Sequence, residues 1–235
     1  MRSNRPGIKI RNLSFSYQNA RKALDNINLE VGTSNRLILA GPNGCGKSTL
    51  LLHLNGLLDG SGEISIAGLE RTRGNMAAIR KRIGYLFSQV EYQFIMPDLL
   101  NDIMLSVPEE ISEISRRKEI AMGWLEQLGL AEYAGRSPLE LSSGEMKRAA
   151  LAGILAREPK VILMDEPLNN LDRESSMQLL DILSALEQTM VIATHRRLVA
   201  EECATHVAFM KKGRIEKMMG ASEALADPLA GQVFF

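Results

Sequence analysis

The chain has 235 residues, 45% of them hydrophobic and 24% charged, so it can bury a sizeable core and is not a disordered chain. Lysine plus arginine and aspartate plus glutamate each number 28, which leaves no overall positive charge to attract nucleic acid or an acidic membrane surface. The two cysteines, Cys45 and Cys203, form no C-x-x-C motif and no cluster with histidines. Neither a disulfide framework nor a zinc site is therefore indicated, and a reducing cytoplasm is expected.

The N-terminal residues 1–10 carry basic side chains without an apolar h-region, and no later stretch reaches the ~18 apolar residues of a membrane-spanning helix. We therefore expect a soluble chain.

The first segments with a regular pattern read as strands. Residues 8–17 and 27–31 alternate apolar and polar side chains, as paired strands do. Residues 36–40 form a short continuous apolar run that ends at a glycine, and residues 161–164 and 190–193 are similar runs. Runs of this kind are typical of a parallel sheet buried on both faces.

Helical patterns lie between these runs, at residues 47–57, 145–157 and 173–186. Strands and helices therefore alternate, as in an open α/β sheet. The stretch from 97 to 157 differs, because it contains no convincing strand, and its residues 113–128 have helix-forming composition and spacing. The pattern predicts one domain over residues 1–235, with an α/β core at 1–96 and 158–235 and an inserted helical lobe at about 97–157.

Residues 41–48, GPNGCGKS, match the pattern G-x-x-x-x-G-K-[ST] between a predicted strand and a predicted helix. The glycines let the backbone turn its N–H groups inward, and the helix adds its positive N-terminal end. Lys47 supplies positive charge to the β and γ phosphates of ATP, and the Ser48 hydroxyl can bind Mg²⁺. A glycine turn that merely caps a helix is the alternative. The residues predicted to bind ATP are Gly41, Asn43, Gly44, Cys45, Gly46, Lys47, Ser48 and Thr49.

The apolar run 161–164 ends in Asp165 and Glu166, which precede a proline. This is the form of a Walker B segment, in which the aspartate holds Mg²⁺ through water. Glu166 lies one residue further on, where it could accept a proton from an attacking water as a general base. Solvated acids at a strand end before a proline turn are the alternative.

Residues 141–145, LSSGE, lead into a helix that carries Lys147 and Arg148. Serine and glycine there present hydroxyl and N–H groups at a positive helix end, which suits a second anion site. The alternative is an ordinary helix start, with Ser142 or Ser143 as N-cap and Glu145 in the first turn.

Taken in chain order, these motifs together with Gln89, residues 170–172 and His195 resemble the complete motif set of the ATP-binding cassette ATPases. The resemblance covers nearly the whole chain. It implies an α/β fold, a P-loop NTPase core with an N-terminal antiparallel β subdomain and an inserted helical lobe. It also implies a head-to-tail homodimer or heterodimer, in which Ser142, Gly144 and Glu145 of one subunit complete the ATP site of the other.

The resemblance also implies roles for single residues. Tyr17 would stack on adenine, Gln89 would sense Mg²⁺ and water, Asp172 would cross the dimer, and His195 would contact the γ phosphate. Glu166, His195 and Gln89 are thus the expected catalytic residues, and the expected Mg²⁺ residues are Ser48, Gln89 and Asp165. From residue type alone, Tyr17 could instead be a half-buried strand aromatic and His195 a polar residue at a helix start.

Two features depart from the family pattern or vary within it. The signature segment of the family, residues 141–145 in this chain, usually has a pair of glycines where Ser143 and Gly144 stand here. Ser143 would therefore bring a Cβ to a crowded interface. Glu145 stands where glutamine is commonest. Cys45 lies in the phosphate loop at a helix N-terminus, a position that predicts a lowered thiol pKa and sensitivity to thiol reagents.

Residues 15–17, 55–57 and 89–94 (FSY, NGL and QVEYQF) resemble the ATPases of energy-coupling factor importers, which include cobalt, nickel and biotin systems. This implies a subunit on the cytoplasmic face of a bacterial or archaeal membrane that powers uptake of a metal ion or vitamin without touching that substrate or nucleic acid. Its integral-membrane partner would dock on the Q-loop and helical lobe through Phe94, Ile95 and Met96, which could instead be core residues of the lobe. An exporter or lipid-extraction subunit and a non-transport regulatory module are the alternatives. Residues 233–235 could pack on a dimer mate or on their own core.

Overall fold

The computed structural model describes residues 6–18 and 22–234. The chain divides into two compact units. The first consists of Met1–Tyr85, Lys160–Glu166 and Leu186–Phe235, and the second of Leu86–Pro159 and Pro167–Ala185. The domain boundaries expected from the sequence, with a lobe at about 97–157, remain a prediction.

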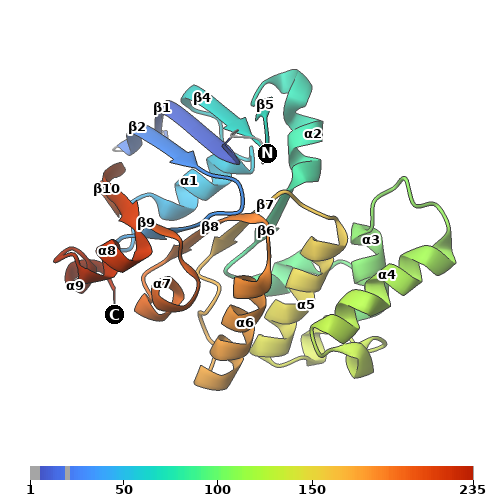
Figure 1. Ribbon diagram of the computed structural model, residues 1–235. Helices are drawn as coiled ribbons and strands as arrows, with labels where there is room; N and C mark the ends of the chain where they lie inside the picture. The colour runs from blue at the N-terminus through green and yellow to red at the C-terminus, as the bar shows by residue number, and fades with distance from the viewer. Residues whose placement is uncertain (1–5, 19–21, 235) are drawn as a thin grey trace, which may run out of the picture. The chain divides into compact units, whose positions relative to one another are not determined.

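An antiparallel sheet of order β2-β1-β4-β5 lies in the first unit (Figure 1). Its strands are β1 (Ile8–Ser16), β2 (Lys22–Val31), β4 (Ser61–Ile66) and β5 (Leu69–Glu70). The alternating pattern of β1 buries Ile8, Ile10 and Leu13 against the core. The predicted antiparallel pair at the start of the chain is therefore confirmed, although its second strand begins at Lys22, before the predicted residue 27.

The second sheet has the order β10-β9-β3-β8-β7-β6. Its strands are β3 (Arg36–Ala40), β6 (Ile83–Leu86), β7 (Val161–Asp165), β8 (Thr189–Thr194), β9 (His206–Lys211) and β10 (Arg214–Gly220). The three apolar runs of the sequence are the neighbours β3, β8 and β7, which pair in parallel. They are buried almost throughout, as expected for parallel strands covered on both faces.

Helix α1 (Lys47–Leu54) follows β3 and packs on β7 and β8. The other helical segments of this unit are η1 (Arg73–Asn75), α2 (Met76–Arg82), α7 (Arg197–Cys203), α8 (Ala221–Ala226) and α9 (Ala230–Val233). Phe234 is buried and meets Phe209 edge to face, with ring centroids 6.2 Å apart. Val233 and Phe234 therefore pack on the core of their own unit, while Phe235 lies outside the described residues.

The second unit is helical. Its helices are α3 (Leu99–Ser106), α4 (Ile114–Gln127), α5 (Ser143–Ala156) and α6 (Arg173–Ala185), with the short 3₁₀ segments η2 (Val90–Gln93), η3 (Ala131–Tyr133) and η4 (Pro138–Glu140). Helices α3, α4 and α5 pack side by side, and α5 also contacts α6 (Figure 1). Residues 97–157 contain no strand, as the sequence predicts.

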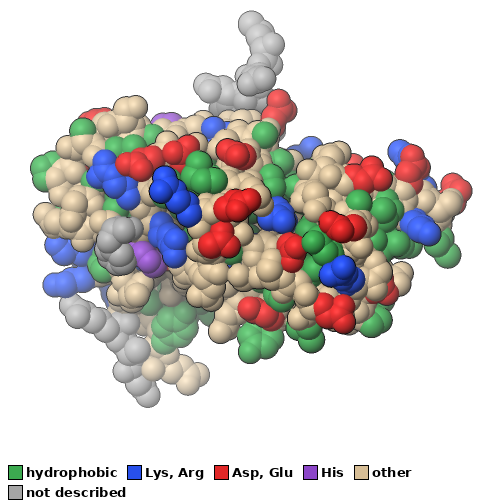
Figure 2. Space-filling model, turned by 90° about the horizontal axis from the view of Figure 1, so that it is seen from below, with side chains coloured by type: hydrophobic (Ala, Val, Ile, Leu, Met, Phe, Trp, Pro, Cys, Tyr) green, Lys and Arg blue, Asp and Glu red, His purple; other side chains and the backbone are tan. Residues whose placement is uncertain are grey.

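Within residues 6–18 and 22–234, no helix combines the length and the apolar character that a membrane span requires. On the face drawn in Figure 2, basic and acidic side chains are interspersed, with hydrophobic side chains between them. This distribution matches the balanced charge of the sequence.

Candidate active site

The phosphate loop connects the end of β3 at Ala40 to the start of α1 at Lys47. Gly44 and Gly46 have φ angles of 76° and 112°, in the left-handed region that favours glycine. A Cβ on Gly46 would also lie 2.6 Å from the carbonyl oxygen of Ala23, so a larger residue would displace the loop. The strand, loop and helix follow one another as the motif predicts.

Lys47 is only 6% exposed, and its ammonium group lies over the loop. The Nζ atom donates to the carbonyl oxygen of Gly41 at 2.7 Å and to that of Pro42 at 3.4 Å. Charge-assisted bonds of this kind hold the positive charge beside the turned backbone of the loop. An incoming phosphate could replace these carbonyls as the acceptor, so the loop is built to receive an anion.

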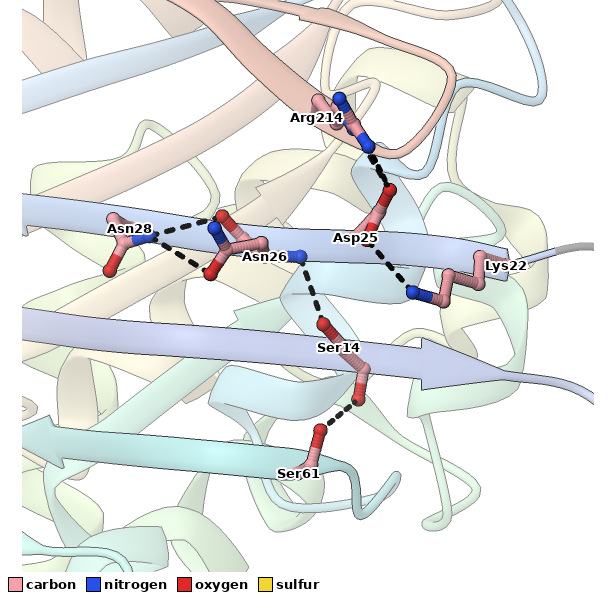
Figure 3. A network of polar contacts seen from close by, with 7 residues as sticks. All are labelled: Ser14, Lys22, Asp25, Asn26, Asn28, Ser61 and Arg214. Carbon is pink, nitrogen blue, oxygen red and sulfur yellow. Dashed lines mark hydrogen bonds and ion pairs between the residues drawn. The ribbon is translucent and has the colours of Figure 1, made fainter.

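The turn between β9 and β10 supports the phosphate loop, and Arg214 at the start of β10 binds Asp25 of β2 (Figure 3). The N–H of Gly213 donates to the carbonyl of Cys45 at 2.9 Å, and the N–H of Asp25 donates to the carbonyl of Gly213 at 2.8 Å. Arg214 donates to one Asp25 oxygen through Nε at 2.9 Å and Nη2 at 2.6 Å, while Lys22 binds the other at 3.1 Å. Arg214, and then Lys22, hold the pKa of the Asp25 carboxyl below its usual range. The turn therefore fixes the loop to strand β2.

Cys45 does not have the lowered thiol pKa predicted from its position. Its side chain is buried, and burial raises the thiol pKa, an effect that the nearby Lys47 charge only partly offsets. A helix N-terminus favours a thiolate, but here the cost of burying the charge is larger. The predicted lowering of the thiol pKa was therefore wrong, because the sequence pattern does not report burial, while the expected sensitivity to thiol reagents stays a prediction.

Asp165, at the end of β7, lies close enough to the Ser48 hydroxyl of α1 to be affected by it. Burial raises the pKa of the Asp165 carboxyl, the Ser48 hydroxyl lowers it, and the neighbouring Glu166 raises it again. Two oxygen donors thus lie together beside the Lys47 charge. Oxygen donors of this type suit Mg²⁺.

Glu166 has a left-handed backbone, with φ of 47°, and its N–H donates to the carbonyl of Ala193 at 2.8 Å. One carboxylate oxygen lies 2.7 Å from His195 Nδ1, and the other accepts from the Thr194 hydroxyl at 2.9 Å. An ionised carboxylate only accepts hydrogen bonds, so His195 carries its proton on Nδ1 when Glu166 is charged. A carboxylate has about four acceptor positions and can bind a water as well. The Glu166 carboxylate can therefore bind a water molecule and accept a proton from it.

Tyr17 follows β1 and is 45% exposed. Its hydroxyl lies 3.3 Å from Thr49 Oγ1, and its ring meets Phe15 edge to face at a centroid distance of 4.9 Å. Phe15 in turn meets the buried His53 at 4.6 Å, and His53 Nδ1 hydrogen-bonds to the Thr49 carbonyl at 2.7 Å. This cluster leaves much of Tyr17 accessible close to the end of the phosphate loop.

Ser142 caps α5 in the second unit through a capping box with Glu145. The Glu145 carboxylate accepts from the Ser142 N–H at 2.8 Å and from the Ser142 hydroxyl at 2.7 Å. The bond from the Ser142 hydroxyl lowers the pKa of the Glu145 carboxyl most, followed by the bond from the Ser142 N–H. Tyr133 lowers this pKa as well. The predicted cap is therefore present, because the Ser142 hydroxyl accepts from the Glu145 N–H at 3.4 Å while it donates to the Glu145 carboxylate.

Gly144 lies against the start of α6, because a Cβ there would be 2.6 Å from the hydroxyl oxygen of Ser175. The Asp172 carboxylate accepts from the Ser175 N–H at 2.7 Å and from its hydroxyl at 3.1 Å. Lys147, on the same helix as Gly144, is turned inward and is buried. Arg148 itself donates to Gln178 at 2.8 Å.

Gln89, which also belongs to the second unit, is exposed and lies directly before η2.

The first unit thus brings together the side chains of Lys47, Ser48, Asp165, Glu166 and His195, with Tyr17 beside Thr49. Sequence reasoning missed Thr194, which holds Glu166 and also accepts from the Arg196 N–H at 3.1 Å. The available signal was weak, a hydroxyl residue at the end of a buried strand next to His195. Three or more potential metal-binding His, Cys, Asp and Glu residues do not cluster anywhere in the described ranges.

The model of the ABC transporter family matches residues 24–169, which is more than half of the chain. The chain belongs to this family. It is an ATP-binding, ATP-hydrolysing cassette subunit, as its motifs predict, and its α/β P-loop fold is that of its relatives.

A protein of Streptomyces avermitilis that is named only as an ABC transporter ATP-binding protein is 36% identical, covering 94% of this chain and 85% of that protein. The energy-coupling factor transporter ATP-binding protein EcfA of Carboxydothermus hydrogenoformans is also 36% identical, covering 88% and 78%. The arginine transport ATP-binding protein ArtP of Haemophilus influenzae is 36% identical as well, covering 96% of each chain.

Among solved structures, CbiO1 of Clostridium perfringens, part of the ABC transporter complex CbiONQ, has a TM-score of 0.83 at 28% identity. The match covers 94% of this chain and 91% of that one. The ATP-binding cassette MJ0796, solved as a dimer bound to ADP and phosphate, has a TM-score of 0.81 at 26% identity, covering 91% and 98%.

Proposed function

We propose that the chain is the ATPase subunit of an energy-coupling factor importer for a metal ion or vitamin. The similarity to EcfA and to CbiO1 supports this choice. ArtP is equally identical in sequence, so overall similarity alone does not select the transporter type. The observation that carries the proposal is the segment from Gln89 to Met96.

This segment has a second glutamine that gives it a fixed shape. Gln93 Oε1 accepts from the Phe87 N–H at 2.8 Å, which closes a loop around Gln89. Asp102 of α3 accepts from the N–H groups of Ile95 and Met96 at 2.7 and 2.9 Å. Between these anchors Tyr92 and Ile95 are 83% and 81% exposed. Exposed apolar side chains on a fixed backbone are suited to bind a helix of an integral-membrane subunit. Phe94 and Met96, expected to share this contact, are half-buried and would line its base.

For the nucleotide we propose the roles that the family resemblance assigns. Tyr17 stacks on adenine, the loop N–H groups surround the phosphates, and the Lys47 ammonium binds the β and γ phosphates. Ser48, Asp165 and Gln89 would hold Mg²⁺, for which the oxygens of Ser48 and Asp165 are fitting donors. When bound, Mg²⁺ neutralises phosphate charge during transfer.

Glu166 is the proposed general base for the attacking water. The hydrogen bonds of Thr194 and His195 to its carboxylate support this role, and His195 would also contact the γ phosphate. Lys47 meets the charge that develops on the phosphoryl oxygens.

A second cassette subunit, identical or different, is the proposed partner, as in the MJ0796 dimer. Ser142, Gly144 and Glu145 of each chain would meet the ATP of the other, and Asp172 would cross between them. ATP binding then closes the dimer and hydrolysis opens it, which drives a membrane subunit on the cytoplasmic side.

Reconstitution tests the proposal. The tagged chain is purified with its membrane subunits in mild detergent, placed in liposomes with ATP on the cassette side, and assayed for movement of labelled metal ions and vitamins. Uptake driven by ATP supports the importer. Efflux would instead favour the exporter or lipid-extraction alternative. Absence of any membrane partner would favour the non-transport regulatory module.

A matched pair of variants tests the docking surface. Tyr92→Ser with Ile95→Ser should lose the membrane partner while ATP hydrolysis by the isolated chain persists. Ile114→Ser, which removes an equally exposed apolar side chain from α4, should keep the partner. Equal partner binding by both variants would contradict the proposed docking surface.

A further inference from the structure

The start of α5 is hydrogen-bonded to the backbone segment that follows Glu166 in the chain. The Ser143 hydroxyl donates to the carbonyl of Asn170 at 3.0 Å. Lys147 Nζ donates to the carbonyl of Pro167 at 2.7 Å and also to that of Asn169. Three carbonyls of one four-residue turn therefore accept hydrogen bonds from one helix. We propose that Ser143 and Lys147 are positioning residues that couple the partner's ATP to Glu166.

The burial of Lys147 makes this contact specific. The side chain is 3% exposed, so its ammonium group depends on the protein for much of its solvation. Charge-assisted bonds to two carbonyls fix the turn more firmly than neutral bonds would. Removing the ammonium would leave the carbonyls of Pro167 and Asn169 without this donor.

Ser143 acts on the strained point of the same turn. Asn170 has a φ of 62°, in the left-handed region that residues other than glycine adopt less readily. The Ser143 bond to the Asn170 carbonyl holds that peptide in place. A glycine at position 143, which is usual in the family, has no side chain to make this bond. The departure from the family pattern therefore adds a contact.

The other end of the segment is held through close packing. Gly144 allows α5 to approach Ser175, and Ser175 donates to the carboxylate of Asp172. The backbone from Pro167 to Asp172 is thus attached to the first turn of α5 along its length. Movement of that turn must move the segment, and Glu166 is the residue immediately before it.

The inference rests on the proposed function, in which Ser142 and Gly144 meet the ATP of a second subunit. Ser143 lies between them, so arrival of the partner's ATP moves the start of α5, whose first two turns carry Ser143 and Lys147. The hydrogen bonds of Ser143 and Lys147 then transmit this movement to the backbone at Glu166. Binding of ATP at one site would thereby set the position of the general base at the other site.

The test measures hydrolysis rate against ATP concentration for the full-length wild type, Ser143→Ala, Ser143→Gly and Ser143→Thr. Loss of one hydrogen bond should lower kcat about 3- to 10-fold in the Ala and Gly variants and bring the Hill coefficient toward 1. Threonine keeps a hydroxyl and should restore most of both values. Ser115→Ala removes an exposed hydroxyl from α4 and should behave as wild type.

Two results would overturn the inference. One is an unchanged kcat and Hill coefficient in Ser143→Ala, and the other is a change explained wholly by a lower melting temperature, with the rate per folded molecule unaltered. Lys147→Met should show the same loss of cooperativity more strongly, with Lys118→Met as the exposed control. Because Lys147→Met also removes a buried charge and can fail to fold, the decision is made on the Ser143 variants.

A second measurement separates this inference from the proposed function. In a Glu166→Gln background, ATP should produce a dimer that light scattering detects, and Ser143→Ala should raise the ATP concentration needed about 3- to 10-fold. No dimer with Ser143 intact would overturn the proposed function and the inference together. Equal dimerisation with and without the hydroxyl would overturn the coupling alone.

Discussion

In the first unit, the polar groups of the site are mostly buried or half-buried and bonded to one another, as with Lys47 in its loop and Glu166 between His195 and Thr194. In the second unit, Ser142 and Asp172 are exposed and Glu145 is half-buried, and all three are hydrogen-bonded within their own helix ends. The first set is preorganised for chemistry, which requires fixed charges away from water. The second set has the character of a surface that gains its function by meeting another molecule.

The largest effect is expected from Glu166→Gln, which tests whether the buried set performs the chemistry. The amide cannot act as a base, so the hydrolysis rate should fall by about 10²- to 10⁴-fold while ATP affinity stays near the wild-type value. Phosphate release and nucleotide binding measure the two quantities separately. Glu216→Gln, on the exposed side of β10, is the control. Wild-type turnover in Glu166→Gln would remove Glu166 from its role.

Lys47→Met should impair the same group of buried polar side chains at the step of ATP binding. Removal of a charged donor aimed at phosphate costs about 3 kcal/mol, or roughly a 100-fold loss of ATP affinity. Isothermal titration with ATP measures this loss, and Lys81→Met supplies an exposed lysine of the same unit as control. An affinity within a factor of two of wild type would show that the ammonium does not bind the phosphates.

The burial of polar groups in the first unit also predicts a pH effect at His53. Burial is the main cause that holds the pKa of His53 below its ordinary 6.5, and its Nε2 has no hydrogen-bond partner among the described residues. Below pH 6.5 the unfolded chain therefore binds a proton that the folded chain resists. The free energy of unfolding should fall as the pH drops through 6.5, by at most about 1.4 kcal/mol per pH unit from this residue.

Urea unfolding at several pH values between 5 and 8 measures this component. His53→Leu should flatten the pH dependence, whereas His206→Leu, which replaces a half-buried histidine of the same unit, serves as the control. An identical slope in wild type and His53→Leu would contradict the assignment.

The smallest effect is expected in the exposed set. Ser142→Ala removes the cap of α5 and should lower the free energy of unfolding by about 1 kcal/mol. Urea unfolding with Ser112→Ala as an exposed serine control measures the difference. A loss above about 3 kcal/mol would mean that Ser142 belongs to a buried network and that the contrast between the two units is wrong.

Much of this arrangement is predictable because its signals are local. The continuous apolar runs give β3, β7 and β8, and the glycines, the cap and the acidic strand end locate the motifs. β10 is missed, since four of its seven residues are exposed and its pattern does not alternate cleanly. The direction of Lys147 and the pKa of Cys45 also escape, because each depends on the residues that surround the side chain in the folded protein. Local patterns carry no such information.

The bonds from Gly213 and Arg214 to the phosphate loop and to Asp25 also bear on how the protein is made. Asp25 and Arg214 are 189 positions apart in the chain. A ribosome synthesises the loop well before the supporting turn. The nascent chain therefore carries its ATP motif without this support until the turn between β9 and β10 has left the ribosome.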